Sequence, residues 1–494
     1  MSRPSSPDPL TPAGQVESAS PAPVNAPKTW RVGTLTYTMA GLVALFGWLL
    51  CGHFAWSMRD RSVGPMAQWY LGDLKVPNVL FGLLLTSFPA LVGLILGPII
   101  AVKSDRHRGK WGRRIPFLLV TTPFAAFGMI GLGLTPVLAE WLHSLGASGS
   151  PFGGWLHQAL GDSTSGAWLL SMLENKMVVS VVCFSVFWAA FEVATIIGYS
   201  VFGGLINDVV PPELLGRFYG LFRTVSLLDG IIFNYWIMGK VPAHFTLILV
   251  IIAVFYGAAF MWVCLKVKEG SYPPPAPAEA VPRGRVDAVA SYFKESFSRP
   301  YYVFVFVMLM TGSLSFIPVN SFSIPYASSL GMDMTAYGHC IAVTFAISLC
   351  LAYFLGWMAD KFHPMRVSMV SLAGYIVVTL AGFVWVKTPE SFAIALVAHG
   401  VLSGCYFTSA ASLAQRLFPR SKFGQFSSAG GLFGSLSMMA IGPAMGALVD
   451  LTGRNYRYTF MIGGLLALVA LISAWLVYVR FMRLGGPKGY VAPV

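Results

Sequence analysis

The sequence predicts an all-α membrane protein made of two related six-helix halves. Hydrophobic residues form 56% of its 494 residues and charged residues only 11%, whereas a soluble chain carries about 25% charged residues. Apolar stretches of roughly 20 residues, the length that crosses a bilayer as a helix, recur twelve times. A proline-rich segment separates the first six stretches from the last six. We therefore expect twelve transmembrane helices arranged as two pseudo-repeats.

The predicted spans divide the chain into five regions. Residues 1–34 are rich in Pro, Ser and Ala and predict a disordered cytoplasmic tail. Residues 35–266 hold the first six spans, and 267–300 form a cytoplasmic linker around consecutive prolines. Residues 301–483 hold the last six spans, and 484–494 form a second cytoplasmic tail.

The longest external loop is predicted at 139–175, between the third and fourth spans, where a small helical cap is expected. The twelve spans are predicted near residues 35–58, 77–102, 115–138, 176–206, 217–239, 244–266, 301–328, 334–359, 365–387, 391–416, 424–449 and 456–482.

The charge distribution predicts the orientation in the membrane. The net charge is +13, and most Lys and Arg fall in loops that share one side when the spans alternate. This bias places those loops and both termini in the cytoplasm. The cations lie in separate short loops without interleaved aromatics, which argues against nucleic-acid binding. We expect a multi-pass protein of the cell (plasma or inner) membrane, with the lipid bilayer as its surroundings.

The sequence lacks the residue patterns that are typical of an enzyme. All six Cys fall inside predicted spans, so neither a disulfide framework nor a metal-ligand spacing is present. No nucleophile and base occur at a usable spacing. We expect a monomer without catalytic activity, cofactor or metal.

A dense basic loop between the second and third predicted spans carries the most specific motif, an Asp-Arg pair followed by Gly-Arg-Arg. A weaker copy occurs after the eighth span. A carboxylate at a helix end, facing a helix N-terminus and Arg partners, forms charge-assisted bonds that can break and re-form. We interpret the motif as a cytoplasmic gate that holds the two halves together; the alternative is a basic loop that only sets topology. The gate candidates are Asp105, Arg106, Gly112, Arg113, Arg114, Asp208, Arg217, Gly356, Asp360 and Lys361.

Ionisable and polar residues inside the spans indicate a transport pathway, because such groups are costly in a bilayer and usually face a cavity. Glu192 lies in the fourth predicted span and Arg223 in the fifth, each on a helix face with polar or aromatic neighbours. The alternative is a structural ion pair between them. The seventh span has a polar run between two prolines, typical of a broken helix. The substrate-binding candidates are Trp188, Glu192, Tyr199, Arg223, Asn234, Asn320 and Tyr326, and the proton-coupling candidates are Glu192 and Arg223.

Three histidines, His53, His339 and His399, also fall within predicted spans. Each could relay a proton, because the unperturbed pKa of histidine is about 6.5. We interpret them instead as histidines packed between helices.

The basic loop resembles that of major facilitator transporters. Its spacing, from Asp105 to Gly112 and the two arginines that follow, is similar to the form found in sucrose/proton symporters. The related glycoside–pentoside–hexuronide, or melibiose-type, permeases carry a similar loop. The resemblance implies a major facilitator fold that binds substrate between its halves.

The fourth span also resembles that of the sucrose symporters, where an aromatic pair, an embedded carboxylate and a helix-end Asp follow in order. Here these are Trp188 with the Phe before it, Glu192 and Asp208, although the symporters have Asp at the position of Glu192. Melibiose-type permeases pair a span-four carboxylate with a span-five Arg, which would map to Glu192 and Arg223.

Departures from these families shape the functional expectation. The span-two carboxylates that bind sodium in melibiose-type permeases are missing from 77–102, and the Lys of their eleventh span is missing from 424–449. The predicted first span also contains no carboxylate. We therefore expect proton-coupled uptake of a sugar or glycoside, with Glu192 as the coupling group. The alternatives are an exporter or lipid/drug-type transporter of the same fold, or a transporter-like membrane sensor.

Overall fold

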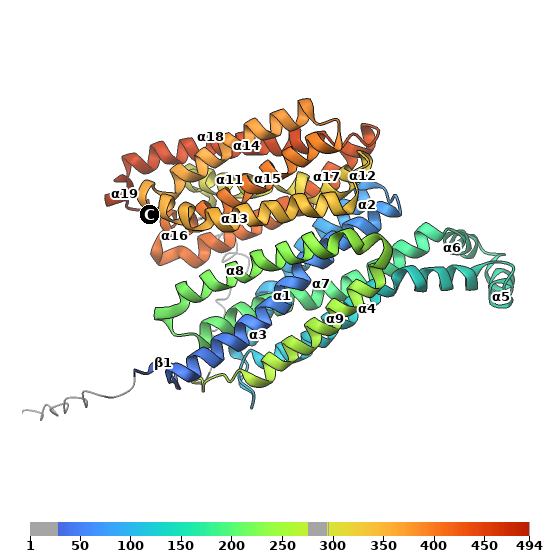
Figure 1. The fold of residues 1–494 in the computed structure, drawn as a ribbon, viewed down its shortest axis with the longest axis horizontal. Helices are drawn as coiled ribbons and strands as arrows, with labels where there is room; N and C mark the ends of the chain where they lie inside the picture. The colour runs from blue at the N-terminus through green and yellow to red at the C-terminus, as the bar shows by residue number, and fades with distance from the viewer. Residues whose placement is uncertain (1–27, 275–293, 295, 494) are drawn as a thin grey trace, which may run out of the picture.

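The computed structural model describes residues 28–274, 294 and 296–493. Within this part of the chain almost every residue is helical, and the helices gather into two bundles that lie beside one another (Figure 1). The first bundle runs from α1 to α9 and the second from α11 to α19. We call them the N-terminal half and the C-terminal half.

The N-terminal half consists of long apolar helices interrupted by short π-helical and 3-10 turns. Its elements are β1 (Trp30–Val32), β2 (Leu35–Tyr37), α1 (Met39–Asp73), α2 (Asn78–Gly82), π-helical η1 (Leu83–Ser87), α3 (Phe88–Arg106), α4 (Ile115–Gly146), α5 (Pro151–Leu160), α6 (Thr164–Glu174), α7 (Lys176–Val209), η2 (Pro212–Leu214), α8 (Leu215–Ile232), π-helical η3 (Phe233–Ile237), η4 (Met238–Lys240) and α9 (Val241–Lys266).

The C-terminal half repeats this plan without a long insertion. Its elements are α11 (Pro300–Leu314), α12 (Ile317–Ser329), α13 (Met334–Phe362), α14 (Pro364–Trp385), α15 (Pro389–Ala410), α16 (Leu413–Leu417), η5 (Arg420–Lys422), α17 (Phe423–Leu451), α18 (Tyr458–Arg483) and α19 (Gly486–Gly489). The break between α11 and α12 falls just before the polar run of the seventh span, where we predicted a broken helix.

The number of spans confirms the predicted fold class. Eleven helical segments in the described residues are long and apolar enough to cross a membrane, and one of them, Pro212–Lys266, contains both α8 and α9. The chain reverses between these two helices at η4 and at His244, whose φ of −132° is not helical (Figure 1). Counted as two, they complete twelve spans.

The first span is longer than its apolar stretch. We predicted it near 35–58, but α1 continues to Asp73, so the charged run Arg59, Asp60 and Arg61 lies within the helix. The expectation that the first span has no carboxylate is therefore wrong. A boundary set by hydropathy stops at the first charges, whereas a helix can continue through charges that find partners inside the bundle.

The two halves meet at one end of the molecule, where α2 and η1 pack against α17, and η3 packs against α13. Asn78 donates from Nδ2 to Asp450 at 2.7 Å and accepts from the Tyr456 hydroxyl at 3.1 Å. A side chain at Gly82 would collide with Gly442, so these helices touch backbone to backbone. We call this the joined end.

The opposite end carries the loop 107–114, the described start of the linker and the β1–β2 hairpin, and we call it the basic end. Helices α8 and α13 diverge toward it, whereas α5 and α6 project beyond the joined end (Figure 1). The sequence predicted the basic end to be cytoplasmic.

Two predicted segments are only partly described. Residues 1–27 of the expected tail lie outside the described residues, and the remainder leads into the antiparallel pair of β1 and β2. Of the expected linker, 275–293 and residue 295 lie outside the described residues. The predicted external loop 139–175 contains the end of α4 and the helical pair α5 and α6.

Candidate functional site

The N-terminal half encloses an arginine in the middle of α1. Arg59 is 1% exposed, and its guanidinium lies 3.9 Å from the ring centroid of Trp56 and 5.3 Å from that of Tyr256. Its Nη1 donates to Thr195 of α7 at 3.2 Å. Glu192, one turn earlier on α7, interacts electrostatically with Arg59. A buried guanidinium requires such a countercharge, because removing an unpaired charge from water is very costly.

A second α1 arginine lies where the two halves face one another. Arg61 donates from Nη2 to Ser226 of α8 at 3.0 Å, and its guanidinium lies 4.8 Å from the ring centroid of Phe345 on α13. Asp229, one turn further along α8, is buried and interacts electrostatically with Arg61. The Arg61 side chain thus belongs to the surface between the halves.

Arg223 does not pair with Glu192 in the structure. Its Nη2 donates to Thr408 of α15 at 3.0 Å, so it connects the N-terminal half with the C-terminal half. The charged residues that act on Glu192 are Arg59 and Asp60, both from α1. Glu192 and Arg223 therefore lie in separate polar clusters.

A third polar group joins the halves through the polar run of span seven. Gln68 of α1 donates to the Asn320 carbonyl oxygen at 3.3 Å. The Asn320 side-chain oxygen lies 3.0 Å from Nε2 of His399, whose Nδ1 lies 2.9 Å from the Tyr375 hydroxyl. The Tyr375 hydroxyl also donates to the Ser315 carbonyl oxygen at 3.2 Å. The buried His399 and Tyr375 thus hold the amide of the exposed Asn320 in one orientation.

The remaining substrate-binding candidates occupy different environments. Trp188 is buried and donates to the Leu84 carbonyl oxygen at 2.9 Å. Asn234 is buried and donates to a carbonyl oxygen one turn back in its own helix, and Tyr326 is buried among aromatic rings. Tyr199 is 72% exposed. Among these four, Tyr199 alone presents its side chain to an open surface.

At the basic end, the first-half gate candidates form a compact ionic cluster. Arg113 donates twice to Asp208, at 2.8 and 2.5 Å, and Arg114 donates to Asp208 at 3.2 Å and also pairs with Asp105. The hydrogen bonds from Arg113 to Asp208 raise the pKa of the Arg113 guanidinium. We expected these residues to hold the two halves together. In this structure the cluster instead joins α3, α7 and the loop 107–114, all within the N-terminal half.

Glu269, at the start of the linker, completes this cluster. Its carboxylate accepts from the backbone N–H groups of Arg113 at 2.9 Å, Arg114 at 2.8 Å and Ile115 at 2.7 Å, which lie at the N-terminus of α4. The Tyr272 hydroxyl donates to Glu269 at 3.0 Å, and the Tyr272 ring lies 4.2 Å from the Arg113 guanidinium. The linker is thereby attached to the loop 107–114.

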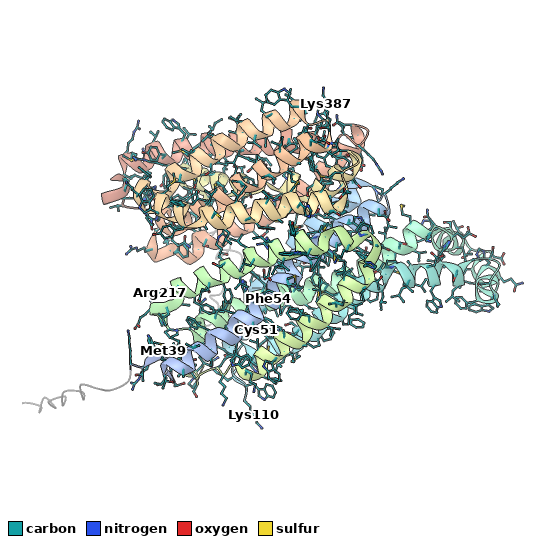
Figure 2. All side chains as sticks on the ribbon, viewed as in Figure 1. Met39, Cys51, Phe54, Lys110, Arg217 and Lys387 are labelled. Atoms are coloured by element: carbon teal, nitrogen blue, oxygen red, sulfur yellow. The ribbon has the colours of Figure 1, made fainter. Side chains whose placement is uncertain are left out.

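Three further gate candidates differ in how tightly they are held. Gly112 has a φ of +99°, and a side chain there would collide with Glu269, so only glycine fits this turn. Arg106 and Arg217 are exposed. Figure 2 shows Arg217 at the start of α8, on the side of the N-terminal half that faces the C-terminal half.

The second copy of the motif is more open. Asp360 is 83% exposed and lies 3.7 Å from the 42% exposed Arg416. The Lys361 ammonium lies 4.7 Å from the centroid of the Trp357 ring, and nothing crowds Gly356. The two copies of the motif therefore differ in burial and in the number of bonds.

The structure adds residues that the sequence analysis missed. Arg59, Asp60 and Arg61 lie just beyond the predicted first span, which ended near residue 58, and α1 continues through them. Glu269 was missed because its partners are backbone N–H groups, which leave no pattern in the side-chain sequence.

The six cysteines are free thiols, and no group of three or more His, Cys, Asp or Glu that could hold a metal ion occurs in the described part of the chain.

Comparisons with known proteins agree with this architecture. The family profile of the Major Facilitator Superfamily matches residues 315–490. The structure of a point mutant of the nucleoside transporter NupG superposes with a TM-score of 0.62 at 11% identity, over 88% of this chain and 100% of the other. The chain has the major facilitator fold.

Two further structures show the same fold. A bacterial homologue of the human lysosomal transporter Spinster, in its inward-facing and occupied conformation, gives a TM-score of 0.59 at 15% identity, over 92% of this chain and 98% of its own. The D-xylose–proton symporter gives 0.58 at 12% identity, over 88% and 96%. No curated protein sequence matches the chain significantly. At these identities the comparisons show the fold.

Proposed function

We propose that the protein is a secondary active transporter that takes up a sugar or glycoside together with protons by alternating access. The observation that carries this proposal is the set of contacts that polar side chains of the membrane-spanning helices make between the two halves. Arg61 faces Phe345, Arg223 bonds Thr408, and Gln68 bonds the Asn320 backbone. Polar groups are retained in the bilayer interior where they serve a pathway.

The arrangement of the halves supports alternating access. Backbone-to-backbone contacts close the joined end, whereas α8 and α13 diverge toward the basic end (Figure 1). In a rocking transporter, one end closes as the other opens around a central site.

The chemistry of the central groups suits a hydroxylated substrate. The amide N–H groups of Asn320 have no partner in the described part of the chain, and the side-chain oxygen of Gln68 lies close to the same backbone segment. Amides of this kind bind adjacent hydroxyl groups by donating and accepting. Similar structures include a nucleoside transporter and a D-xylose–proton symporter. We place Asn320, Arg223 and Arg61 in the substrate site.

For coupling we retain Glu192 and replace its proposed partner. The carboxylate lies beside the buried Arg59 instead of Arg223. Protonating Glu192 would leave Arg59 with less countercharge and would change the stability of the α1–α7 contact. Because Arg59 of α1 and Glu192 of α7 belong to one cluster, the protonation state would bias how these two helices pack and thereby which end opens.

The test is transport of a panel of labelled sugars and nucleosides into proteoliposomes. With an imposed gradient of two pH units, one-to-one coupling permits accumulation of about 100-fold. We expect Glu192→Gln to retain exchange of internal for external substrate and to lose gradient-driven accumulation. Glu174→Gln, on the exposed α6, is the matched control and should accumulate substrate normally. Full accumulation by Glu192→Gln would refute the coupling role.

A second candidate function is transport of a lipid-like or apolar compound. A cavity of about 690 Å³ lies between α13 and α15 and is lined almost entirely by apolar side chains. Substrate competition distinguishes the candidates: an apolar cargo should compete with labelled phospholipid and not with sugars.

A further inference from the structure

A cavity of about 620 Å³ lies at the basic end of the N-terminal half, away from the proposed pathway. One wall is the loop from Arg108 to Gly112, and the other runs from the end of α9 into the linker as far as Tyr272. Arg108, Lys110 and Lys268 supply three cations to its lining. The transport proposal assigns no role to this cavity.

The charges around the cavity leave a net positive potential. Lys110 and Lys268 are exposed and make no hydrogen bond or ion pair with the part of the chain that the structure describes. Arg108 donates to three backbone carbonyl oxygens, which do not neutralise it. The acidic residue of the lining, Glu269, already binds three backbone N–H groups and the Tyr272 hydroxyl. An anion would therefore meet two lysines without carboxylate partners.

The same cavity adjoins the lipid-facing surface. Exposed apolar side chains follow one face of α9 at helical spacing and end at Leu265, which lines the cavity. Trp111, 53% exposed, lies on the loop side. Figure 2 shows Lys110 on the side of the N-terminal half that points away from the C-terminal half. The α9 stripe consists of Leu247, Ile251, Val254, Trp262 and Leu265.

Exposed tryptophan and lysine together at the end of a span are characteristic of the membrane–water interface. Basic pockets at this depth bind phosphate-bearing lipid headgroups, and each cation near the surface strengthens binding of anionic lipid. A soluble phosphate would use the lysines alone. The acyl chain of a phospholipid would in addition cover the exposed apolar stripe of α9.

We propose that this cavity binds the headgroup of an anionic phospholipid, with the phosphate between Lys110 and Lys268 and the acyl chains along α9. Because Lys110 belongs to the loop 107–114 and Lys268 to the linker, one lipid connects the two segments that Glu269 already joins. The bound lipid thereby stabilises the basic end of the N-terminal half, whatever the protein transports.

The test is native mass spectrometry of the purified full chain, titrated with phosphatidylglycerol or with phosphatidylcholine of the same acyl composition. We expect phosphatidylglycerol to be retained and phosphatidylcholine to be removed under the same activation. Lys110→Gln/Lys268→Gln should weaken phosphatidylglycerol binding about 30-fold. Lys103→Gln/Arg217→Gln removes the same charge from exposed sites outside the cavity lining and should bind like the unmodified protein.

Three results would overturn the proposal. These are equal retention of both lipids, equal loss of binding in both double variants, and unchanged binding in Lys110→Gln/Lys268→Gln. Inorganic phosphate and glycerol phosphate form a separate arm, measured as a shift in thermal unfolding. If either compound alone shifts unfolding as much as phosphatidylglycerol does, the cavity binds soluble phosphate and the lipid assignment is wrong.

Discussion

The two copies of the basic-loop motif lie at equivalent places in the two halves, yet they build different structures. In the N-terminal half, the motif's Asp105 is 54% exposed and pairs with Arg114, which is 9% exposed and shares the 10% exposed Asp208 of α7 with Arg113. In the C-terminal half, Asp360 is 83% exposed and lies 3.7 Å from Arg416, which is itself 42% exposed. The first copy is a buried, multiply bonded cluster, and the second is a solvated pair.

This difference shows that a repeated motif need not have a repeated energetic role. Breaking a buried pair leaves a desolvated charge without its partner, whereas an exposed pair contributes little because water screens it. The first cluster also includes Glu269, which has no counterpart in the second copy within the described residues. We infer that the ionic cluster makes the basic end of the N-terminal half rigid.

The largest expected effect is that of Asp208→Asn. The substitution removes the countercharge of two arginines, one of them 9% exposed, and should destabilise the protein by about 3–5 kcal/mol. Thermal unfolding in detergent measures the change. Asp208→Glu, which keeps the charge, is the control, and a melting temperature equal to that of the unmodified protein in Asp208→Asn would contradict the cluster's role.

A second effect should appear at the turn of the C-terminal half that corresponds to the loop 107–114. His363, between α13 and α14, is 7% exposed, and burial lowers its pKa to about 4. The unfolded state has the higher pKa, near 6.5, so it takes up the proton first as the pH falls. Stability should therefore be nearly complete above pH 7 and fall by about 2 kcal/mol by pH 5.

His363→Asn should remove this pH dependence. Asparagine can accept from the Met365 N–H as the His363 ring does, and it tolerates the positive φ of 77° better than most residues. Melting curves at pH 8 and pH 5 for both proteins measure the effect. An unchanged difference between the two pH values in His363→Asn would assign the dependence to other groups.

A smaller effect is expected for Glu269→Gln. The amide still accepts hydrogen bonds but lacks the charge that favours a helix N-terminus, which should cost about 1 kcal/mol. Hydrogen exchange at the amides of Arg113, Arg114 and Ile115 should accelerate. Glu213→Gln, at an exposed position in η2, should leave exchange at these amides unaltered.

The smallest effect should be that of Asp360→Asn, which removes the exposed partner of Arg416. We expect a change below about 0.5 kcal/mol, measured as for Asp208→Asn. A loss as large as that of Asp208→Asn would mean that the exposed pair stabilises the protein as much as the buried cluster does.

The fold could be predicted from the sequence because spans and helix breaks are determined by local features, namely hydropathy and the positions of prolines. The twelve spans and the two halves followed from these patterns, and the break at the start of the polar run in span seven followed from its prolines. The C-terminal boundary of α1 could not be predicted in this way. Charged residues such as Arg59 and Arg61 are typical of loops, and only their partners on α7, α8 and α13 explain why the helix continues through them.

The site was harder to predict because partner choice is a property of helix rotation and tilt. Helical spacing placed Glu192 and Arg223 on polar faces, but the rotation of the helices turns one toward Arg59 and the other toward Thr408. His399 was interpreted as a packed histidine. It is buried, as that interpretation implied, and it also orients Asn320, which only the spatial arrangement could show.

The π-helical turns η1 and η3 both lie at the joined end, where η1 packs against α17 and η3 against α13. A π-turn holds one more residue than an α-turn and its hydrogen bonds are less regular, so a helix yields there more readily than elsewhere. Any rocking of the halves will concentrate its flexing at these two points. The second and fifth spans should then act as hinges, while the ionic cluster of the N-terminal half moves as one piece.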